Sequence, residues 1–388
     1  MIQFEHRPGI LDLSWGHPRP ALLPVREWAA AAECLDWRAL TYGAPAGPDS
    51  LLESLGDPDR TFVTGGASHG LALLTQVLTS PGDIVVVDSP TYHLAFPILR
   101  DRGLLLHQAP VTAPAPAPPT SLDPATSLDP ATCLDPALLA RFIVNMRAKG
   151  ERVSMLYLVP TFGNPTGRSL PGDRRRELID VARREGVTIV EDDTYRELAY
   201  DGEAPPSLWE LAGGAPVVRL GSFAKTVAPG LRLGWINAEP EIIQRLTGLG
   251  YVHSGGGVNH TTAVTMGAFR AGGGYRRHVD RVRAEYRTQR NALVSALRTE
   301  FTGVESPAGG WFVWLPLPDR MTAGELLPIA ERHGVSFVPG NRFWADGSGG
   351  HGRIRLSFSH LPADDLRRAA EQLAKAVTAR RHPPLSTR

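Results

Sequence analysis

The stretch that decides the fold reads VTIVEDDTY at residues 187–195, an apolar run that ends in three acidic residues and a tyrosine. An apolar run of this length is typical of a strand that is buried on both faces of a parallel sheet. Residues 83–88 (DIVVVD) and 154–160 (SMLYLVP) follow the same pattern. Because helix-like segments separate these runs, the sequence predicts a mostly parallel sheet with helices on both faces.

Further elements are predicted on either side of these runs. In the first 270 residues we expect further strands at 61–64, 153–159, 217–220 and 233–237. We expect helices at 25–36, 92–101 and 173–185. Beyond that point the pattern changes, and we expect a long helix at 275–300, a strand at 310–317, a helix at 323–333, a strand at 354–358 and a last helix from 363. The second half of the pattern predicts a smaller α+β unit.

The chain is therefore expected to have three parts. These are an N-terminal segment (1–40) that packs with the small domain, a large domain (41–270) and a small C-terminal domain (271–388). Residues 108–137 interrupt the large domain with a Pro/Ala-rich stretch and the hexapeptides SLDPAT, SLDPAT and CLDPAL. Such a composition favours an extended surface loop, with a docking segment for a partner as the alternative.

Composition excludes several classes of protein. The 41 Lys+Arg and 40 Asp+Glu residues give a net charge of +1, which provides no electrostatic reason to bind nucleic acid or an acidic membrane. No apolar run reaches the roughly 18 residues of a membrane span, and residues 1–16 lack the pattern of a secretory signal. The two cysteines, Cys34 and Cys133, lack zinc-site spacing. We expect a cytoplasmic protein that uses no metal.

Lysine is rare in this chain and therefore informative. The three lysines are Lys149, Lys225 and Lys375, and all other basic residues are arginines. Lys225 stands in GSFAKTVAPGLRLGW (221–235), among small and apolar residues. A lysine whose pKa is lowered by burial is a good imine-forming nucleophile. A surface lysine at the end of a strand is the alternative interpretation.

Other chemically useful residues follow the predicted strands at their carboxyl ends, where open α/β sheets bind ligands. Residues 164–167 (NPTG) and 89–92 (SPTY) each follow an apolar strand. Residues 65–70 (GGASHG) lie between a strand and a helix, where free N–H groups and the helix dipole suit a phosphate. With Lys225 and the acids at 191–193, one edge of the sheet is predicted to carry an amine, an acid, an amide, an anion cup and an aromatic ring.

Four motifs occur in the order typical of one family: YLVPTFGNPTG, VEDDTYREL, GSFAKTVAPGLRLGW, and VPGNRF followed by RIRLSFS. In these motifs the chain resembles the pyridoxal-phosphate enzymes of fold type I, class I/II aminotransferase family. It is most similar to the branch of aromatic and 2-aminoadipate aminotransferases and of the aminotransferase-like domains of certain transcription regulators. The resemblance covers roughly residues 10–380 and implies pyridoxal 5′-phosphate as cofactor.

The resemblance implies catalytic roles at the matching positions. Lys225 would form the Schiff base with the cofactor and then carry a proton. Asp192 would pair with the pyridine nitrogen and keep it protonated, with Asp193 as the competing candidate. Asn164 and Tyr195 would hydrogen-bond the 3′-oxygen of the ring.

The remaining contacts are implied in the same way. The phosphate would be held by a cup formed by Gly66, Ala67, Ser68, His69, Ser222 and Arg232. Tyr92 would stack on the ring, and Arg355 would clamp the substrate carboxylate with its planar fork. Independently of the resemblance, Asn164, Trp15 and Gly16 are candidate substrate contacts, and further candidates for the pocket are His17, Arg19, His253, Asn259 and His260. Arg19 is the candidate second cation if the acceptor is a dicarboxylate. Tyr42 would reach the phosphate of a neighbouring subunit, which implies a homodimer with shared active sites.

The chain also departs from the family pattern. Ser68 and His69 stand where a pair of glutamines is usual, and Ala224 stands where a phosphate-binding serine is common. The segment 51–60 is shorter than the family's helix at that place, and 253–260 (HSGGGVNH) is richer in glycine. The first three departures change the phosphate cup and the entrance of the site rather than the lysine or the acid.

Three functions are consistent with this pattern. The leading prediction is an aminotransferase that acts on an L-amino acid and a 2-oxo acid. The alternative keeps the cofactor but uses it for β- or γ-elimination or replacement, C–C bond formation or cyclisation, with S-adenosylmethionine among the candidate substrates, or for oxidation. A third interpretation, a non-catalytic effector-sensing protein, predicts a missing lysine or acid, and both residues are present.

Overall fold

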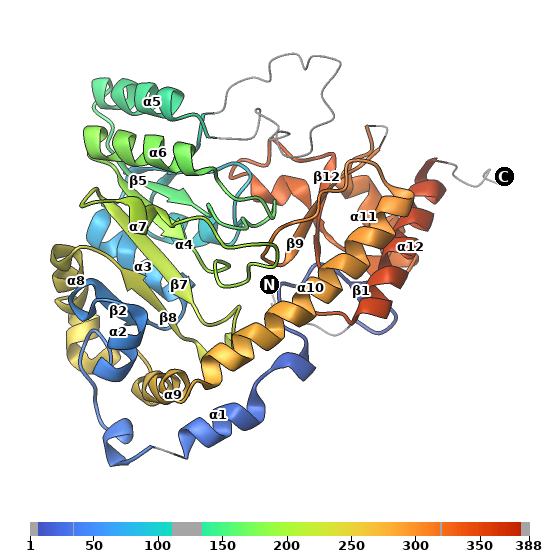
Figure 1. Cartoon of the computed structure of the whole chain (residues 1–388). Coiled ribbons are helices and arrows are strands. Elements are labelled where there is room, and N and C mark those ends of the chain that lie inside the picture. The colour runs from blue at the N-terminus through green and yellow to red at the C-terminus, as the bar shows by residue number, and fades with distance from the viewer. Residues whose placement is uncertain (1–6, 34, 111–133, 319, 382–388) are drawn as a thin grey trace.

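The structure is a computed structural model, and it describes residues 7–33, 35–110, 134–318 and 320–381 (Figure 1). Both cysteines and the two SLDPAT copies lie outside the described residues, so the prediction of a loop there is not tested. Within the described stretches, no helix is long and apolar enough to cross a membrane. No group of three or more His, Cys, Asp or Glu side chains in the same stretches is arranged to hold a metal ion.

The large sheet has seven strands in the order β2-β8-β7-β6-β5-β3-β4. Their bounds are β2 (Thr61–Thr64), β3 (Ile84–Val87), β4 (Leu105–Gln108), β5 (Val153–Leu158), β6 (Thr188–Asp192), β7 (Val217–Ser222) and β8 (Gly234–Asn237). The five strands from β4 to β7 run parallel, whereas β8 is antiparallel to both of its neighbours. This arrangement confirms the α/β class and the mostly parallel sheet predicted from the apolar runs.

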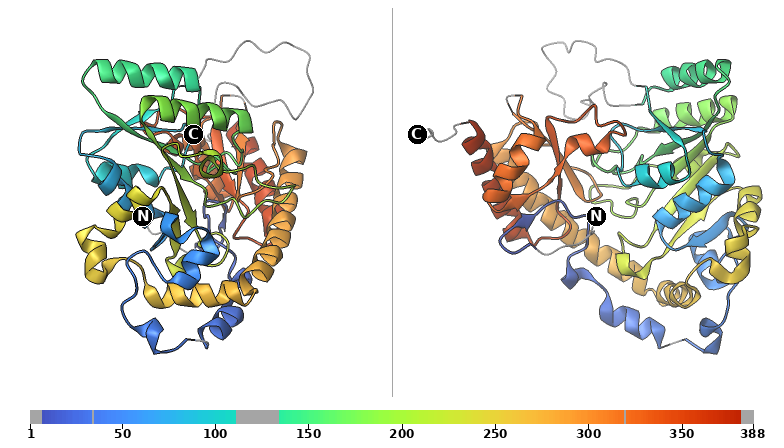
Figure 2. Two further views of the ribbon diagram at one scale, coloured as in Figure 1. Left: turned by 60° about the vertical axis from the view of Figure 1, so that its left-hand side comes forward. Right: turned by 180° about the vertical axis from the view of Figure 1, so that it is seen from behind.

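Helices cover both faces of this sheet, as Figures 1 and 2 show. One face packs against α3 (Ala67–Leu78), α4 (Ala95–Asp101) and α8 (Pro240–Thr247). The other face packs against α5 (Pro136–Ala148), α6 (Gly172–Glu185) and α7 (Leu208–Leu211). In β3, Val85 and Val87 face the first set and Ile84 and Val86 face the second. The continuous apolar pattern of the strands follows from this burial on both faces.

The predicted loop 108–137 ends earlier than the sequence suggested. α5 begins inside the last copy of the hexapeptide, with a proline at its first position. Asp135 caps this helix, because its carboxylate accepts hydrogen bonds from the backbone N–H groups of Ala137 (2.8 Å) and Leu138 (3.1 Å). An Asp-Pro pair supplies both signals of a helix start, so this part of the repeat is helical.

A second, three-stranded antiparallel sheet has the order β11-β12-β9. It is formed by β9 (Phe312–Pro316), β11 (Val338–Pro339) and β12 (Arg353–Ser357). The helices packed around it are α10 (Gly274–Glu300), α11 (Ala323–Arg332) and α12 (Ala363–Arg381). The long helix α10 runs from the region of α9 (His260–Ala271) beside the large sheet to the small sheet (Figure 2).

The N-terminal segment contacts both parts of the molecule. β1 (Leu11–Asp12) pairs in parallel with β10 (Val335–Ser336), and the next residue, Leu13, is buried in the core of the small sheet. α1 (Val25–Ala32) lies along α9, where the ring of Trp28 packs against Phe269. The segment therefore crosses between the two sheets, and this path brings residues 14–17 to the space between them.

Candidate active site

The carboxyl ends of the parallel strands open into a cavity of about 530 Å³. The residues singled out in the sequence that line this cavity are Gly16, His17, Ala67, Ser68, Tyr92, Asn164, Asp192, Tyr195, Ser222, Ala224, Lys225 and Arg232. They follow β3, β5, β6 and β7 or open α3, and Gly16 and His17 come from the N-terminal segment. The predicted convergence of strand ends on one edge is therefore what the structure shows.

Lys225 lies three residues beyond β7 and reaches into the cavity. Its Nζ atom lies 4.9 Å from the ring centre of Trp311 and 5.8 Å from that of Tyr195. Desolvation lowers the pKa of this amine to about 8, helped by the charge of Arg355 and opposed by Asp192. Roughly a tenth of the amine is therefore neutral at pH 7, far more than for an exposed lysine, and the neutral form is the one that a nucleophile requires.

Asp192 ends β6 and points into the cavity. Its Oδ2 atom accepts a hydrogen bond from the hydroxyl of Tyr157 (2.8 Å), while Oδ1 is buried with no hydrogen-bond partner among the described residues. Burial raises the pKa of Asp192, and the bond from Tyr157 opposes that rise. A buried carboxylate oxygen with a free lone pair suits a cationic ring N–H, because such a donor would satisfy it.

The competing candidate, Asp193, points the other way. Its Oδ2 atom accepts a hydrogen bond from Nε of Arg219 (2.8 Å), and the residue does not line the cavity. Successive residues of a strand face opposite sides of the sheet, so only one of the two acids can face the cavity. The geometry selects Asp192.

Asn164, Tyr195 and Arg355 form a connected polar group. Nη1 of Arg355 donates to Oδ1 of Asn164 (2.9 Å), and Nη2 donates to the carbonyl of Ser14 (2.7 Å). Asn164 also hydrogen-bonds Tyr195. The Arg355 guanidinium lies 4.2 Å from the ring centre of Phe312, and burial lowers its pKa to about 10. The guanidinium is still charged at neutral pH.

The start of α3 forms an anion cup. Gly66 has a φ of +100°, and a Cβ atom there would lie 2.8 Å from Nη2 of Arg232. That guanidinium donates to the carbonyl of Gly65 (3.0 Å). Ala67 and Ser68 occupy the first helical turn, whose N–H groups have no intrahelical partner. Ser222 accepts a hydrogen bond from the Ala224 N–H (3.1 Å), which leaves its own hydroxyl hydrogen available.

A second cavity of about 550 Å³ adjoins the first and shares Gly16, Tyr92, Asn164, Tyr195 and Lys225 with it. Its lining adds two predicted substrate contacts, Trp15 and Arg355, together with Phe312, Phe337, His93 and Arg342. His17 lines both cavities. The lysine thus lies where the two cavities meet, and the second cavity has aromatic side chains, arginines and one carboxylate, Glu331, in its lining.

Several predicted residues lie elsewhere. His69 lines neither cavity, because its Nδ1 accepts a hydrogen bond from the Gly65 N–H (2.9 Å), and burial lowers its pKa. Arg19 also lines neither cavity and pairs with Glu285 at 3.3 Å. Asn259 caps α9 by accepting from Thr262.

Two further predicted contacts, Tyr42 and His260, line a separate hollow. The Tyr42 side chain is 87% exposed, so it makes no contact with the cavity of its own chain. His253 lines none of the three spaces described so far. These placements leave Gly16, Trp15 and His17 as the N-terminal contributions to the site.

Sequence reasoning gave no role to Tyr157. The register of the sheet explains its position: Tyr157 in β5 is opposite Val190 in β6, and Asp192 lies two residues further along on the same face. If the sequence had shown that β5 pairs with β6, this register would have indicated the contact between Tyr157 and Asp192. His93, Arg342 and Trp311 were also missed.

The fold and this site together define a pyridoxal-phosphate-dependent enzyme of fold type I. The chain belongs to the family described as aminotransferase class I and II, whose model matches residues 41–373. It is 34% identical to the 2-aminoadipate transaminase of Thermus thermophilus over 97% of this chain and 92% of that protein. It is 30% identical to aromatic-amino-acid aminotransferase 1 of Thermococcus litoralis over 97% and 90% of the two chains.

Solved structures agree with these relatives. A kynurenine aminotransferase of Pyrococcus horikoshii, in complex with PMP, superimposes with a TM-score of 0.84 at 28% identity, over 96% of this chain and 91% of that one. An alpha-aminoadipate aminotransferase of Thermus thermophilus, in complex with N-(5′-phosphopyridoxyl)-L-leucine, gives a TM-score of 0.78 at 31% identity, over 96% and 93%. The predicted family and cofactor are confirmed.

The residues present fit this cofactor. Asp192 has a buried, unpartnered oxygen for the ring nitrogen, and the anion cup has free N–H groups and a guanidinium for the phosphate. Lys225 lines the same cavity and would supply the amine for the aldehyde. Ala224 supplies no side-chain donor to the cup, whose described lining has side-chain donors in Ser68, Ser222 and Arg232.

Proposed function

We propose that the protein is an aminotransferase that moves an amino group from an L-amino acid to a 2-oxo acid, with the cofactor held on Lys225. The observation that carries this proposal is the presence of an amine, a free carboxylate oxygen and a phosphate cup in one cavity beside a buried arginine. When bound, the cofactor ring withdraws electrons from the substrate Cα and so makes its proton acidic.

Lys225 moves the proton in this proposal. Its amine lies at the junction of the two cavities, next to both the ring position and the substrate chamber. A pKa of about 8 allows the amine to accept a proton from the substrate Cα and to release it again near neutral pH. The rings of Trp311 and Tyr195 lie close to this amine and give it apolar surroundings on that side.

Asp192 holds a proton on the pyridine nitrogen. Its carboxylate must be ionised for this task, and the hydrogen bond from Tyr157 favours that form. Asn164 and Tyr195 orient the opposite side of the ring, while Tyr92 lines the cavity and provides a ring face for stacking. The acid and the amide thus define the two ends of the ring site.

Arg355 binds the substrate carboxylate. It is 5% exposed and lies against Phe312, and its Nε atom has no hydrogen-bond partner among the described residues. A planar guanidinium in an apolar setting binds a carboxylate more strongly than an exposed one. The contact of Arg355 with Asn164 ties the carboxylate site to the ring site.

The substrate side chain would lie in the second cavity, whose walls include Trp15, Phe312, Phe337 and His93. Arg342 also lines this space, and no ion pair is found for it among the described residues. Arg19, one of the pocket candidates named from the sequence, does not line this space and is paired with Glu285. We therefore propose Arg342 as the group that binds a second carboxylate, a chemistry that matches the name of the 2-aminoadipate relative.

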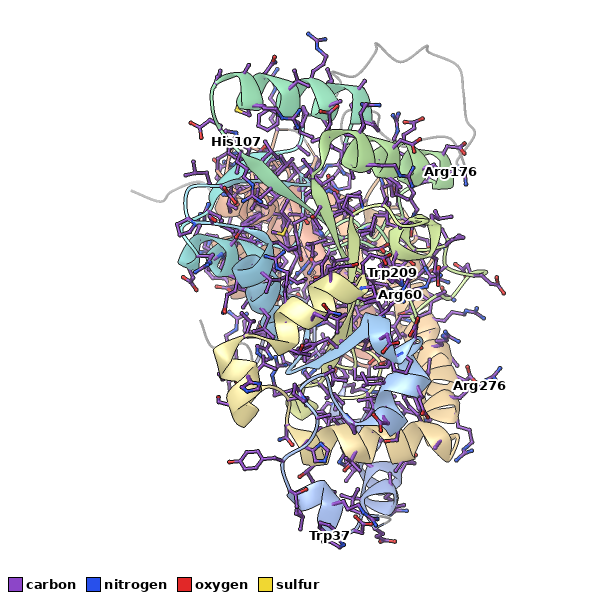
Figure 3. All side chains as sticks on the ribbon, turned by 90° about the vertical axis from the view of Figure 1, so that its left-hand side faces the viewer. Trp37, Arg60, His107, Arg176, Trp209 and Arg276 are labelled. Atoms are coloured by element: carbon purple, nitrogen blue, oxygen red, sulfur yellow. The ribbon has the colours of Figure 1, made fainter. Side chains whose placement is uncertain are left out.

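A homodimer with shared sites is part of the same proposal. Trp37, Leu40 and Tyr42 are 68%, 78% and 87% exposed, and they follow one another along the chain near η2 (Trp37–Leu40). Figure 3 shows Trp37 at the margin of the molecule. Large apolar side chains exposed in one short segment are typical of a protein–protein contact. The three-part division of the chain and a cytoplasmic location also remain proposals.

The test is the visible absorption spectrum of the purified protein during addition of single L-amino acids, with S-adenosylmethionine included. An amino donor should convert the cofactor to its amine form and release one equivalent of 2-oxo acid, and Lys225→Ala should lack the initial visible band. If the initial spectrum of the cofactor returns and no amino group has been transferred to it, the result would instead support elimination, bond formation or oxidation. A wild-type protein that acquires no visible band with the cofactor would overturn the proposal.

A further inference from the structure

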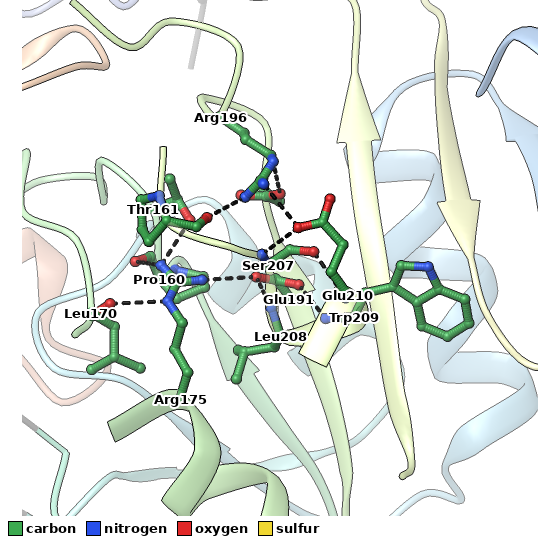
Figure 4. Close-up of polar contacts among 12 residues, drawn as sticks. Pro160, Thr161, Leu170, Arg175, Glu191, Arg196, Ser207, Leu208, Trp209 and Glu210 are labelled. Carbon is green, nitrogen blue, oxygen red and sulfur yellow. Dashed lines mark hydrogen bonds and ion pairs between the residues drawn. The ribbon is translucent and has the colours of Figure 1, made fainter. Parts of the chain in front are cut away.

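Behind the cofactor cavity lies a buried arginine that the mechanism above does not use. Arg175 belongs to α6, and neither its side chain nor that of Glu191 in β6 is exposed to solvent. The two side chains form an ion pair at 3.4 Å (Figure 4). A fully buried charged pair needs further hydrogen bonds to offset its desolvation, so its other partners are informative.

The other partners of Arg175 are the two ends of one loop. Its Nη2 donates to the carbonyl of Pro160 (2.7 Å) and to Oγ1 of Thr161 (3.0 Å), and its Nε donates to the carbonyl of Leu170 (2.9 Å), as Figure 4 shows. The backbone closes the same neck, because the Leu170 N–H donates to the Pro160 carbonyl (2.8 Å). The loop between these ends carries Asn164.

Glu191 connects the arginine to the acid of the cofactor site. It immediately precedes Asp192 in β6, and its carboxylate accepts hydrogen bonds from the N–H groups of Leu208 (2.9 Å) and Trp209 (3.1 Å) at the start of α7. Since successive strand residues face opposite sides, Glu191 faces Arg175 while Asp192 faces the cavity. A shift of Glu191 would therefore shift Asp192 with it.

The surrounding charges balance this pair. Asp193 pairs with Arg219 at 2.8 Å, and Arg196 pairs with Glu210 at 2.8 Å. With Arg175 and Glu191, the group contains three arginines and three carboxylates. Arg196 also lies 3.9 Å from Asp193, so two of the pairs are linked and a shift of one charge changes the surroundings of the others.

We propose that Arg175 is a positioning residue of the active site, whose guanidinium fixes the loop of Asn164 relative to the strand end of Asp192. Asn164, which would bond the ring oxygen, and Asp192, which would bond the ring nitrogen, then stay at a constant distance from each other. The inference depends on the proposed function, because it assumes that Asn164 and Asp192 contact the cofactor ring.

The chemistry of the side chain supports an arginine at this place. A guanidinium presents five N–H donors in a rigid plane, and Arg175 uses them on two carbonyls, a hydroxyl and a carboxylate. A lysine ammonium has three donors at a single point, so it can keep the charge but not bridge both ends of the loop. Arg175→Lys therefore separates the bridging geometry from the charge.

The experiment is a double-mutant cycle between Arg175→Lys and Asn164→Ala, with Arg176→Lys as the matched control. Arg176 is the next residue of α6, its side chain is 62% exposed, and it lies on the outer surface in Figure 3. The readout is the pH at which the visible band of the cofactor-loaded protein titrates. A hydrogen bond donated by Asn164 would favour the ionised form of the ring oxygen. Loss of Asn164 should therefore raise the pH midpoint at which the visible band titrates.

We expect Arg175→Lys to raise the midpoint by about one pH unit and to lower kcat about tenfold, in the range that a misplaced catalytic group produces. Arg176→Lys should change neither quantity. In the double variant the midpoint should equal that of Asn164→Ala alone, because the arginine acts through the asparagine. An unchanged midpoint in Arg175→Lys would show that Arg175 serves stability alone, and additive shifts in the double variant would show that it does not act through Asn164; either result overturns the proposal.

Two further measurements keep the test decisive. If Arg175→Lys does not fold, Thr161→Val removes one of the bonds of Arg175 and should shift the midpoint in the same direction by a smaller amount; no shift overturns the proposal. In the cofactor-free protein, Arg175→Lys should accelerate amide hydrogen exchange at Gly163 and Gly167, whose N–H groups bond within the loop. Faster exchange in a protein that binds no cofactor would refute the proposed function and not the clamp.

Discussion

The pKa of Lys225 can be measured without the cofactor, because the chain has three lysines. Burial disfavours the charged amine, so its pKa falls to about 8, and the amine loses its proton as the pH rises through that value. Reductive ¹³C-methylation should give three dimethyl-lysine signals by NMR. The signal that is missing in Lys225→Ala should titrate with a midpoint near 8. If the signal of this residue showed an amine that stays protonated up to pH 10, the result would contradict the proposed buried position.

Tyr157→Phe tests the contact that sequence reasoning missed. The change removes the hydrogen bond to Asp192 and therefore raises the pKa of that carboxylate further. Because Asp192 must be ionised, the acidic limb of the profile of kcat/KM should move to higher pH, with about a tenfold loss of activity at pH 6. Tyr200→Phe is the control, since that buried hydroxyl bonds the Gly310 carbonyl instead. Equal pH profiles for the two variants would remove Tyr157 from the mechanism.

Arg342→Ala tests the recognition of a second carboxylate. A charge-assisted hydrogen bond is worth roughly 1.5–3 kcal/mol, so the KM for a dicarboxylic 2-oxo acid should rise at least about tenfold. The KM for pyruvate, which has no second carboxylate, should change less than about twofold. Arg19→Ala should leave both values unchanged, because Arg19 is paired outside the cavity. A uniform rise for both substrates would assign Arg342 a role in folding or closure.

At the level of elements, the start of α3 makes a distinct prediction. Gly66→Ala forces a Cβ atom to within 2.8 Å of the Arg232 guanidinium and also strains a backbone with φ of +100°. Gly82→Ala is matched for strain, because φ there is +89° but nothing lies within 4 Å of the added atom. Gly66→Ala should weaken pyridoxal-phosphate binding about tenfold by equilibrium dialysis, as expected for strain of roughly 1–3 kcal/mol in the cup. Gly82→Ala should bind the cofactor normally.

Helices and strands differ in how well the sequence predicts them. Six of the seven strands of the large sheet were predicted, because patterns such as those of β3 and β6, which are apolar on both faces, are strong, whereas β4 was missed. α5, α8 and α9 were missed, and two of these begin at capping residues, Asp135 and Asn259, next to proline- or glycine-rich stretches. A cap is a single side chain, so the breaker residues around it dominated the local pattern.

At the scale of the whole molecule, the sequence predicted which strand ends carry chemistry but not how the strands are ordered. The order β2-β8-β7-β6-β5-β3-β4 places β5 beside β6, and so Tyr157 beside Asp192. The lining of the second cavity depends on a contact that is even more distant in the sequence. β1 pairs with β10, more than 300 residues away, and this pairing places Trp15 and Gly16 at the cavity. The sequence offered these two residues as candidate substrate contacts, but local periodicity contains no information on the pairing that brings them to the site.

A mixed dimer tests whether Tyr42 acts across the subunit interface. Co-expression of a Lys225→Ala chain and a Tyr42→Ala chain with different affinity tags yields hybrid dimers that can be purified over both tags. If Tyr42 contacts the partner's phosphate, one site of the hybrid carries both defects. The other site has an intact lysine and receives an intact tyrosine from the partner.

The hybrid should therefore show about half of the wild-type kcat, although both parent homodimers are impaired, because one of its two sites is complete. This expectation follows from the exposure of Tyr42, which is 87%, and from its absence from the cavity of its own chain. Sedimentation velocity on each preparation should show a dimer. A hybrid no more active than the Tyr42→Ala parent would place the tyrosine's effect within its own subunit, and a monomeric wild-type protein would remove the shared site from the proposal.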